Sequence, residues 1–189
     1  CARVFEVKAR PAFDPLIVHL ASAEWLPRVA DLDRAPQALV QLLARRFWPG
    51  PLTLVLPRHP DVPSIVTSGL DSVAVRVPEH PVALALLKAL DRPLAAPSAN
   101  RFGELSPTRA EHVLLGLGDA VPLILDGGPA RVGVESSIVD LTGGEPDPSS
   151  ELGGGAEAGP ALYDVGTLSE DSHVPALYDV GTLSEDSHV

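Results

Sequence analysis

Short apolar runs, separated by proline, glycine and polar residues, recur along the first three quarters of the chain. Runs of this length between turn residues are typical of buried strands. They predict strands at 16–20, 52–56, 73–77, 94–96, 123–125 and 137–141. Apolar residues at helical spacing predict helices over 36–47, 81–90 and 107–117. Strands and helices alternate, so the pattern indicates an α/β fold with a mixed, largely buried sheet.

Prolines mark the ends of the predicted helices. Pro36 and Pro81 fall in first turns, where a missing N–H costs little. The segment 48–51 (WPGP) must end the helix before it, because two prolines and a glycine forbid its continuation. Ser106 is a good N-cap residue and Pro107 suits the next position, so we expect the third helix to begin there.

The last quarter of the chain differs in composition from the rest. Residues 160–174 (PALYDVGTLSEDSHV) are repeated without change at 175–189, and the segment before them, SSELGGGAEAG, has a linker composition. Two copies are too few for a solenoid. We therefore predict one domain over 1–144 and a flexible acidic tail over 145–189 that takes no part in the fold.

Charge follows the same division. The net charge is −11, but 145–189 holds ten acidic residues and no Lys or Arg, which leaves 15 acidic and 14 basic residues in 1–144. The acidic balance therefore says little about what the domain binds.

One cysteine, Cys1, excludes an internal disulfide and a cysteine zinc site, and suits a reducing compartment. The apolar runs are too short to cross a membrane.

Polar residues that could bind a ligand or take part in catalysis fall at the ends of the predicted strands. Lys8 and Arg10 could grip a polyphosphate or lie on a solvated surface. His19, inside an apolar strand, fits a core histidine or a ligand-binding one. Arg76, on the predicted strand that follows Ser72, needs a partner, which is either an internal acid or the carboxylate of a ligand.

Two loops add neutral donors and tight turns. The loop 97–105 and the turn at Ser106 offer hydroxyls, an amide and a helix N-terminus suited to phosphate, although Ser106 is also explained as a helix cap. The glycines of 126–129 (DGGP) and 133–137 (GVESS) permit tight turns. No Walker loop, GxGxxG, HExxH or GxSxG motif is present. A Ser-His-Asp hydrolase stays open by residue type alone, but the clusters together favour a phosphate-bearing ligand and a small carboxylate ligand.

Five strings lie in one order along the chain: KARPAFDPLIVHL, FWPGPLTLVL, VAVRVPEHP, APSANRFGELSPT and LDGGPARVGVESSIVDLTG. Their order and spacing over residues 3–143 resemble the YrdC-like threonylcarbamoyl-AMP synthases. The resemblance implies a twisted, open, mixed sheet flanked by helices. It also implies synthesis of L-threonylcarbamoyladenylate and pyrophosphate from L-threonine, bicarbonate and ATP, for the t6A modification of tRNA at position 37.

The resemblance assigns roles to residues that match the family's motifs. ATP contacts are implied for Lys8, Arg10, Asp14, Ser72, Ser98, Asn100 and Ser106. Threonine contacts are implied for His19, Arg76, Ala96 and Ser136. Many members carry Asn where this chain has Asp14, and an acid there would repel phosphate unless it reached Mg²⁺ or a ribose hydroxyl. No residue is implied as a covalent nucleophile.

The resemblance also implies partners and a location. Mg²⁺ would arrive with ATP, no protein metal site is expected, and tRNA and the proteins of the t6A transfer complex would be partners in the cytoplasm. The chain lacks the family's N-terminal Pro-Thr-x-Thr-x-Tyr-Gly-Leu segment and its C-terminal Arg-Pro-Gly segment, so we expect both ends of the site to be incomplete. The alternatives are an inactive fragment, a non-catalytic module that binds RNA or a nucleotide, and a carbamoyl-transferring relative of the hydrogenase-maturation type.

Overall fold

The computed structural model describes residues 1–11, 13–130, 137–143, 162–163 and 178–179. Its α-helices are α1 (Ala2–Lys8), α2 (Gln37–Phe47), α3 (Pro81–Leu90) and α4 (Ala110–Leu117). Its 3₁₀ helices are η1 (Ala23–Arg28), η2 (Leu32–Arg34) and η3 (Gly118–Ala120). Its strands are β1 (Ile17–His19), β2 (Thr53–Pro57), β3 (Ser72–Arg76), β4 (Leu94–Ala96), β5 (Ile138–Asp140), β6 (Leu162–Tyr163) and β7 (Tyr178–Asp179).

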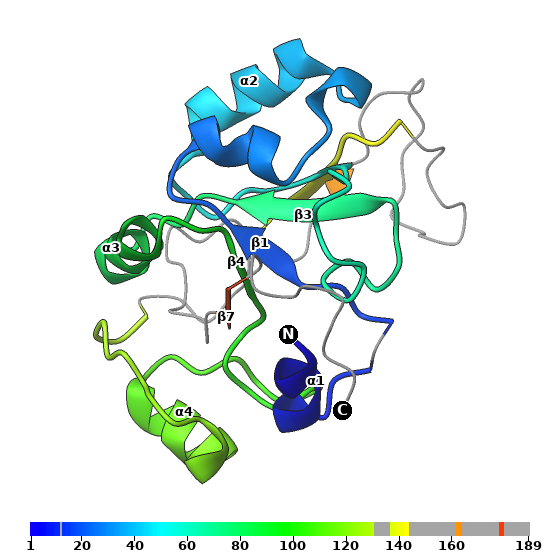
Figure 1. The fold of residues 1–189 in the computed structure, drawn as a ribbon. Helices are drawn as coiled ribbons and strands as arrows, with labels where there is room; N and C mark the ends of the chain where they lie inside the picture. Colours follow the sequence, from blue (N-terminus) through cyan, green and yellow to red (C-terminus); the bar gives the residue numbers. More distant parts are fainter. Residues whose placement is uncertain (12, 131–136, 144–161, 164–177, 180–189) are drawn as a thin grey trace.

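The strands form one mixed sheet in the order β6-β5-β2-β3-β1-β4-β7. β1 pairs in parallel with β3, and β2 with β5, while every other pair is antiparallel. In Figure 1, α2 lies on one side of the sheet, and α1 and α4 lie on the other. The α/β fold with a mixed sheet that the sequence predicts is confirmed.

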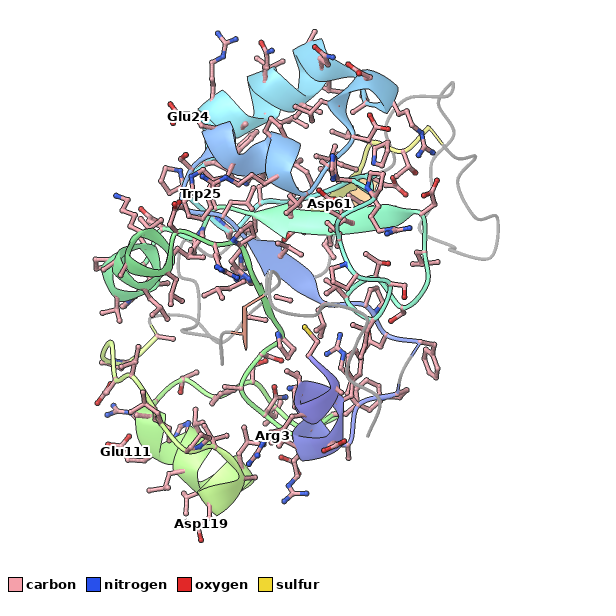
Figure 2. The ribbon with its side chains drawn as sticks, viewed as in Figure 1. Arg3, Glu24, Trp25, Asp61, Glu111 and Asp119 are labelled. Atoms are coloured by element: carbon pink, nitrogen blue, oxygen red, sulfur yellow. The ribbon has the colours of Figure 1, made fainter. Side chains whose placement is uncertain are left out.

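The core lies between the central strands and α2. Val18, Leu54 and Val75, on three neighbouring strands, have no exposed surface. Strands that are apolar on both faces need a cover on both faces, which the helices provide. Charged side chains such as those of Arg3, Glu24, Glu111 and Asp119 lie at the periphery instead (Figure 2).

The structure places α2 and α3 where the sequence predicts helices. α2 starts after Pro36 and ends before Trp48, as the prolines on either side require. In α3, Pro81 occupies the first turn, and the buried residues Ala83 and Leu87 lie four apart on one face. These boundaries depend on local chemistry, so the sequence was sufficient to predict them.

The predicted helix over 107–117 is wrong at its start. α4 begins at Ala110, because Arg109 has an extended backbone with φ −147° and ψ 155°. The N–H of Thr108 donates to the His112 ring over 3.4 Å, and the carbonyl of Thr108 accepts from the N–H of Ala130 over 2.8 Å. These bonds hold the backbone of Thr108 outside the helix, so Ser106 is not its N-cap.

The predicted strand at 123–125 is also wrong. This segment pairs with no strand among the described residues, and Leu123 is 72% exposed. A short apolar run becomes a strand only where a neighbouring edge accepts its backbone bonds. The 3₁₀ helices and the helical conformation of 2–8 were not predicted from the pattern.

Two pieces of the C-terminal segment pair with the sheet. β6 lies beside β5, and β7 lies beside β4, so each copy of the repeated segment contributes one two-residue strand to an opposite edge. The remainder of 145–189 lies outside the described residues. The expectation that 145–189 takes no part in the fold is therefore wrong for 162–163 and 178–179, while the domain boundary at 144 and the flexibility of the tail stay predictions.

Candidate functional site

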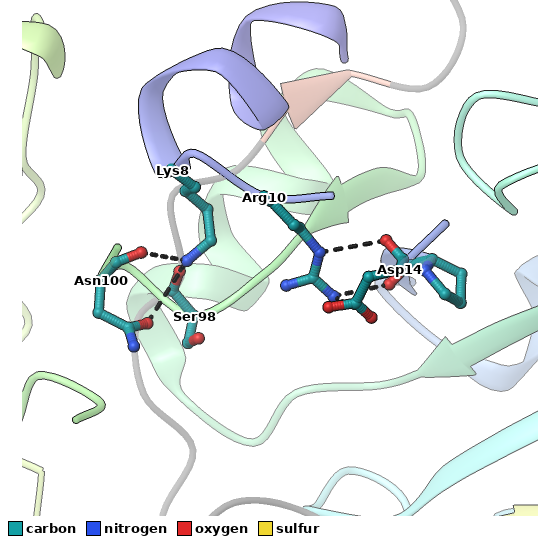
Figure 3. A network of polar contacts seen from close by, with 6 residues as sticks. Lys8, Arg10, Asp14, Ser98 and Asn100 are labelled. Atoms are coloured by element: carbon teal, nitrogen blue, oxygen red, sulfur yellow. Dashed lines mark hydrogen bonds and ion pairs between the residues drawn. The ribbon is translucent and has the colours of Figure 1, made fainter. Parts of the chain in front are cut away.

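Lys8 ties the end of α1 to the loop after β4. Its ammonium group donates to the backbone carbonyls of Ser98 and Asn100 and lies 3.4 Å from Asn100 Oδ1 (Figure 3). The carbonyl of Lys8 accepts from the N–H of Phe102 over 2.8 Å. Lys8 is only 4% exposed, so its charge is compensated by these oxygens. The interaction holds the loop that carries Ser98 and Asn100 against α1.

Arg10 is fixed to the turn that precedes β1. Its Nε donates to the carbonyl of Asp14 over 3.1 Å, and its Nη2 donates to the carbonyl of Pro15 over 2.9 Å. The same Nη2 lies 2.8 Å from Asp14 Oδ1, an ion pair four residues apart in sequence (Figure 3). Arg10 and Lys8 therefore come from one short segment but have different partners.

His19 and Arg76 meet at the carboxyl ends of two parallel strands. The register of β1 with β3 sets them side by side, and Arg76 Nη2 lies 2.9 Å from His19 Nε2. His19 is 1% exposed, and burial lowers its pKa well below the usual value, with the nearby Arg76 charge acting in the same direction. The neutral ring accepts the Arg76 hydrogen bond through Nε2, which leaves its own proton on Nδ1.

Ala96 lies two residues along the sheet from this pair. It is buried in β4 opposite Ile17 of β1, in the register that sets Leu94 opposite His19. Directly beyond Ala96 the chain enters the loop held by Lys8. Because β4 runs antiparallel to β1, the carboxyl end of β4 and the Lys8 loop lie at the amino ends of β1 and β3, whereas the His19–Arg76 pair lies at their carboxyl ends.

Three of the predicted site residues lie apart or outside this arrangement. Ser72 and Arg76 start and end β3, four residues apart, so their Cα atoms are separated by about 13 Å at the rise of a strand. Ser106 lies in the loop before α4 and is half-buried. Ser136 lies outside the described residues.

His80 is a polar residue of interest that the sequence did not single out. Its Nδ1 accepts from the N–H of Val82 and caps α3, and its Nε2 lies 3.2 Å from the carbonyl of Gly127. It lines a cavity of about 80 Å³ together with Thr108 and Asp126. A histidine directly before a helix-starting proline was the available signal, because such a residue is free to cap.

A larger apolar groove of about 630 Å³ lies between η1 and α2. Leu26, Val40 and Trp48 line it, and it extends to Val77, the residue after Arg76. His19 and Arg76 are not among its lining residues. Open space therefore begins just past the carboxyl end of β3, where α/β sheets commonly bind ligands.

The part of the chain that the structure describes contains no group of three or more His, Cys, Asp or Glu residues placed to hold a metal ion. Among the same residues, none of the helices has the length and apolar character needed to cross a bilayer. The charged residues of the candidate site are the cations Lys8, Arg10 and Arg76 and the acid Asp14. Cations with planar or multiple donors suit carboxylate and phosphate ligands.

Comparison with known proteins identifies the family. The family model for Sua5, YciO and YrdC proteins, described as "Telomere recombination", matches residues 1–149, and the chain belongs to this family. Over 140 residues it is 52% identical to the threonylcarbamoyl-AMP synthase of Pyrococcus abyssi, covering 74% of this chain and 40% of that protein. Over 138 residues it is 47% identical to the Bacillus subtilis protein of the same name, covering 72% and 39%.

A solved structure agrees with the sequence comparison. The crystal structure of P. abyssi Sua5 complexed with L-threonine matches 75% of this chain with a TM-score of 0.71 and 52% identity, and the match covers 41% of that chain. The family and the fold expected from the sequence motifs are thereby confirmed. The chain spans about two-fifths of the length of these relatives.

Proposed function

We propose that this chain carries the threonine and ATP sites of an L-threonylcarbamoyladenylate synthase. The proposal rests mainly on the Arg76 guanidinium, which a neutral, buried His19 holds at the carboxyl ends of β1 and β3. The relatives named threonylcarbamoyl-AMP synthase, and the P. abyssi structure that contains L-threonine, support this assignment.

Arg76 would bind the carboxylate of L-threonine. Guanidinium and carboxylate form paired charge-assisted bonds, which fix orientation as well as add affinity. His19 contributes by remaining neutral, since a second positive charge beside Arg76 would repel it and disturb its position. Ala96 has a small side chain that lets a ligand come close to the β4 backbone.

The α1–β1 connection and the loop after β4 would bind ATP with its Mg²⁺. Arg10 supplies a cation for the phosphates, and Lys8 adds its charge while holding the loop of Ser98 and Asn100 in place. Ser98 has a hydroxyl and Asn100 an amide that suit a nucleotide. Ser72 and Ser106 lie farther along the chain, and their ATP contacts remain predictions, as does the threonine contact of Ser136.

The reaction then requires positioning and charge stabilisation. The threonine amine attacks bicarbonate to form a carbamate, and a C–O bond breaks to release water. A carbamate oxygen then attacks the α-phosphate of ATP, and the bond to the β-phosphate breaks to release pyrophosphate. Negative charge grows on the departing pyrophosphate, and Arg10 and Lys8 offset it. Holding the carbamate in line with the leaving group supplies much of the acceleration. tRNA and the t6A transfer proteins would use the product, in the cytoplasm.

Pyrophosphate release from ATP tests this function. We expect release only when L-threonine and bicarbonate are both present, and we expect Arg76→Ala to raise the KM for threonine at least about tenfold through loss of a charge-assisted contact. Arg46→Ala, an exposed arginine at the end of α2, is the matched control and should leave release unchanged. ATP turnover that is indifferent to threonine would contradict the proposal.

A further inference from the structure

Asp14 is the acid of the candidate site whose role the sequence leaves open. A carboxylate beside a phosphate-binding arginine would compete with phosphate or would orient the arginine toward it. The contacts of Arg10 distinguish these two roles, because a guanidinium has two edges and three nitrogens.

One edge of Arg10 is fully occupied. Nε and Nη2 donate to the carbonyls of Asp14 and Pro15, at 3.1 and 2.9 Å, and Nη2 also pairs with Asp14 Oδ1 at 2.8 Å. Within the described residues, no acceptor contacts Nη1. Figure 3 shows this third nitrogen pointing away from Asp14, toward the side where Lys8 and Ser98 lie.

We propose that Asp14 is a positioning residue: it holds the Nε/Nη2 edge of Arg10 and so presents Nη1 to the phosphates of ATP. This inference rests on the proposed function. The Arg10 side chain is only 14% exposed, and a charge at that depth needs a counter-ion when no ligand is bound. Asp14 supplies it without occupying Nη1, so phosphate can bind while the ion pair stays intact.

The two backbone carbonyls favour the positioning role of Asp14 over competition between its carboxylate and phosphate for Arg10. They belong to the same turn as the carboxylate, and a phosphate cannot replace them without moving the backbone before β1. Arg10 therefore enters the ligand complex already oriented. Preorganisation of this kind improves affinity because less conformational freedom is lost on binding.

Binding of Mg²⁺·ATP and of inorganic tripolyphosphate, measured by calorimetry at fixed ionic strength, tests the inference. We expect Asp14→Ala to weaken both about fivefold to tenfold, the range for losing support from a charged hydrogen bond. Asp14→Asn keeps one acceptor oxygen for Nη2, so its affinity for both probes should fall no more than about threefold. Asp61→Ala, whose side chain is 85% exposed, is the control and should bind as the wild type does.

A double-mutant cycle with Arg10→Ala excludes a purely structural effect. If Asp14 acts through Arg10, then Asp14→Ala causes no further loss once Arg10 is absent. In the pyrophosphate assay the single variant should raise the KM for ATP and leave kcat within about twofold. Tighter binding by Asp14→Ala, an undiminished loss in the Arg10→Ala background, or a wild type that binds neither probe would overturn the inference.

The two proposals fail separately. A wild type that binds ATP with the expected coupling between Asp14 and Arg10, but releases no threonine-dependent pyrophosphate, contradicts the proposed function and leaves the positioning role intact. Threonine-dependent release without that coupling contradicts the positioning role alone.

Discussion

At the scale of single residues, the site depends on cations, two of which, Lys8 and Arg76, find their partners in distant parts of the chain. Sequence motifs singled out Lys8, Arg10, His19 and Arg76, but they did not indicate which atoms would meet. The position of His19 inside an apolar strand is also explained by a buried core histidine that binds no ligand. Its contact with Arg76 follows from the parallel register of β1 and β3, which is set by the whole sheet and not by the local pattern.

Lys8→Met tests the role of the buried ammonium. The substitution keeps the length of the side chain but leaves the carbonyls of Ser98 and Asn100 without their donor. We expect a loss of about 2 kcal/mol in the free energy of unfolding, the cost of unsatisfied buried acceptors, together with weaker ATP binding. Lys88→Met, the same change at an exposed position of α3, should cost less than about 0.5 kcal/mol in urea titrations. Equal losses for the two variants would contradict this role.

The neutral state of His19 predicts a dependence of stability on pH. Because its folded-state pKa lies well below 6.5, only the unfolded chain takes up a proton when the pH falls past 6.5. The free energy of unfolding should therefore fall below pH 6.5 by up to about 1.4 kcal/mol per pH unit.

His19→Gln keeps an acceptor for Arg76 and removes the titrating ring. Urea unfolding at pH 7.5, 6.5 and 5.5 should show a smaller acid loss for this variant than for the wild type. A slope that the substitution does not change would show that His19 is not responsible for it.

At the scale of elements, local chemistry was enough wherever proline or periodicity decided the boundary. α2 and α3 and five of the six predicted strands are present within a residue or two of their expected limits. The strand predicted over 123–125 does not form, because a strand needs a pairing partner, which the apolar run itself does not specify. α4 begins late because the backbone of Thr108 bonds to Ala130 and His112, and Ala130 is far away in sequence.

Arg109→Ser tests the corrected start of α4. Arg109 has the extended backbone of an N-cap but makes no capping bond with its side chain. Serine at this position can accept from the first turn, so we expect the free energy of unfolding to rise by about 0.5–1 kcal/mol. If the helix began at 107 instead, position 109 would lie inside the first turn and serine would bring no gain. Thermal unfolding at one protein concentration distinguishes the two results.

At the scale of the whole molecule, the sheet order separates a well-covered centre from short edges. β2 and β3 are flanked by strands on both sides and carry fully buried Leu54, Leu56 and Val75. β6 and β7, two residues each, form the edges. This order could not be read from the sequence, because apolar runs of similar length occur in central and outer strands alike.

Hydrogen exchange should follow that order. We expect the amides of β2 and β3 to exchange slowest, with protection close to the global free energy of unfolding, since they open only with the core. Amides of β6 and β7 should exchange within the fastest class, because a two-residue edge pairing opens alone. Mass spectrometry of peptides over 53–57, 72–76 and 162–163 measures the difference, and equal protection at centre and edge would contradict it.

The Lys8 contact also bears on the order in which the molecule forms. Lys8 and its acceptors are 90 and 92 residues apart in the chain, so the contact closes a long loop that carries a large entropic cost. It can form only after Asn100 has been synthesised and β4 has joined β1. Until then the lysine stays hydrated, and the loop of Ser98 and Asn100 has no fixed shape. On a ribosome, the nucleotide affinity that we propose would thus arise late and abruptly, once the far half of the sheet is in place.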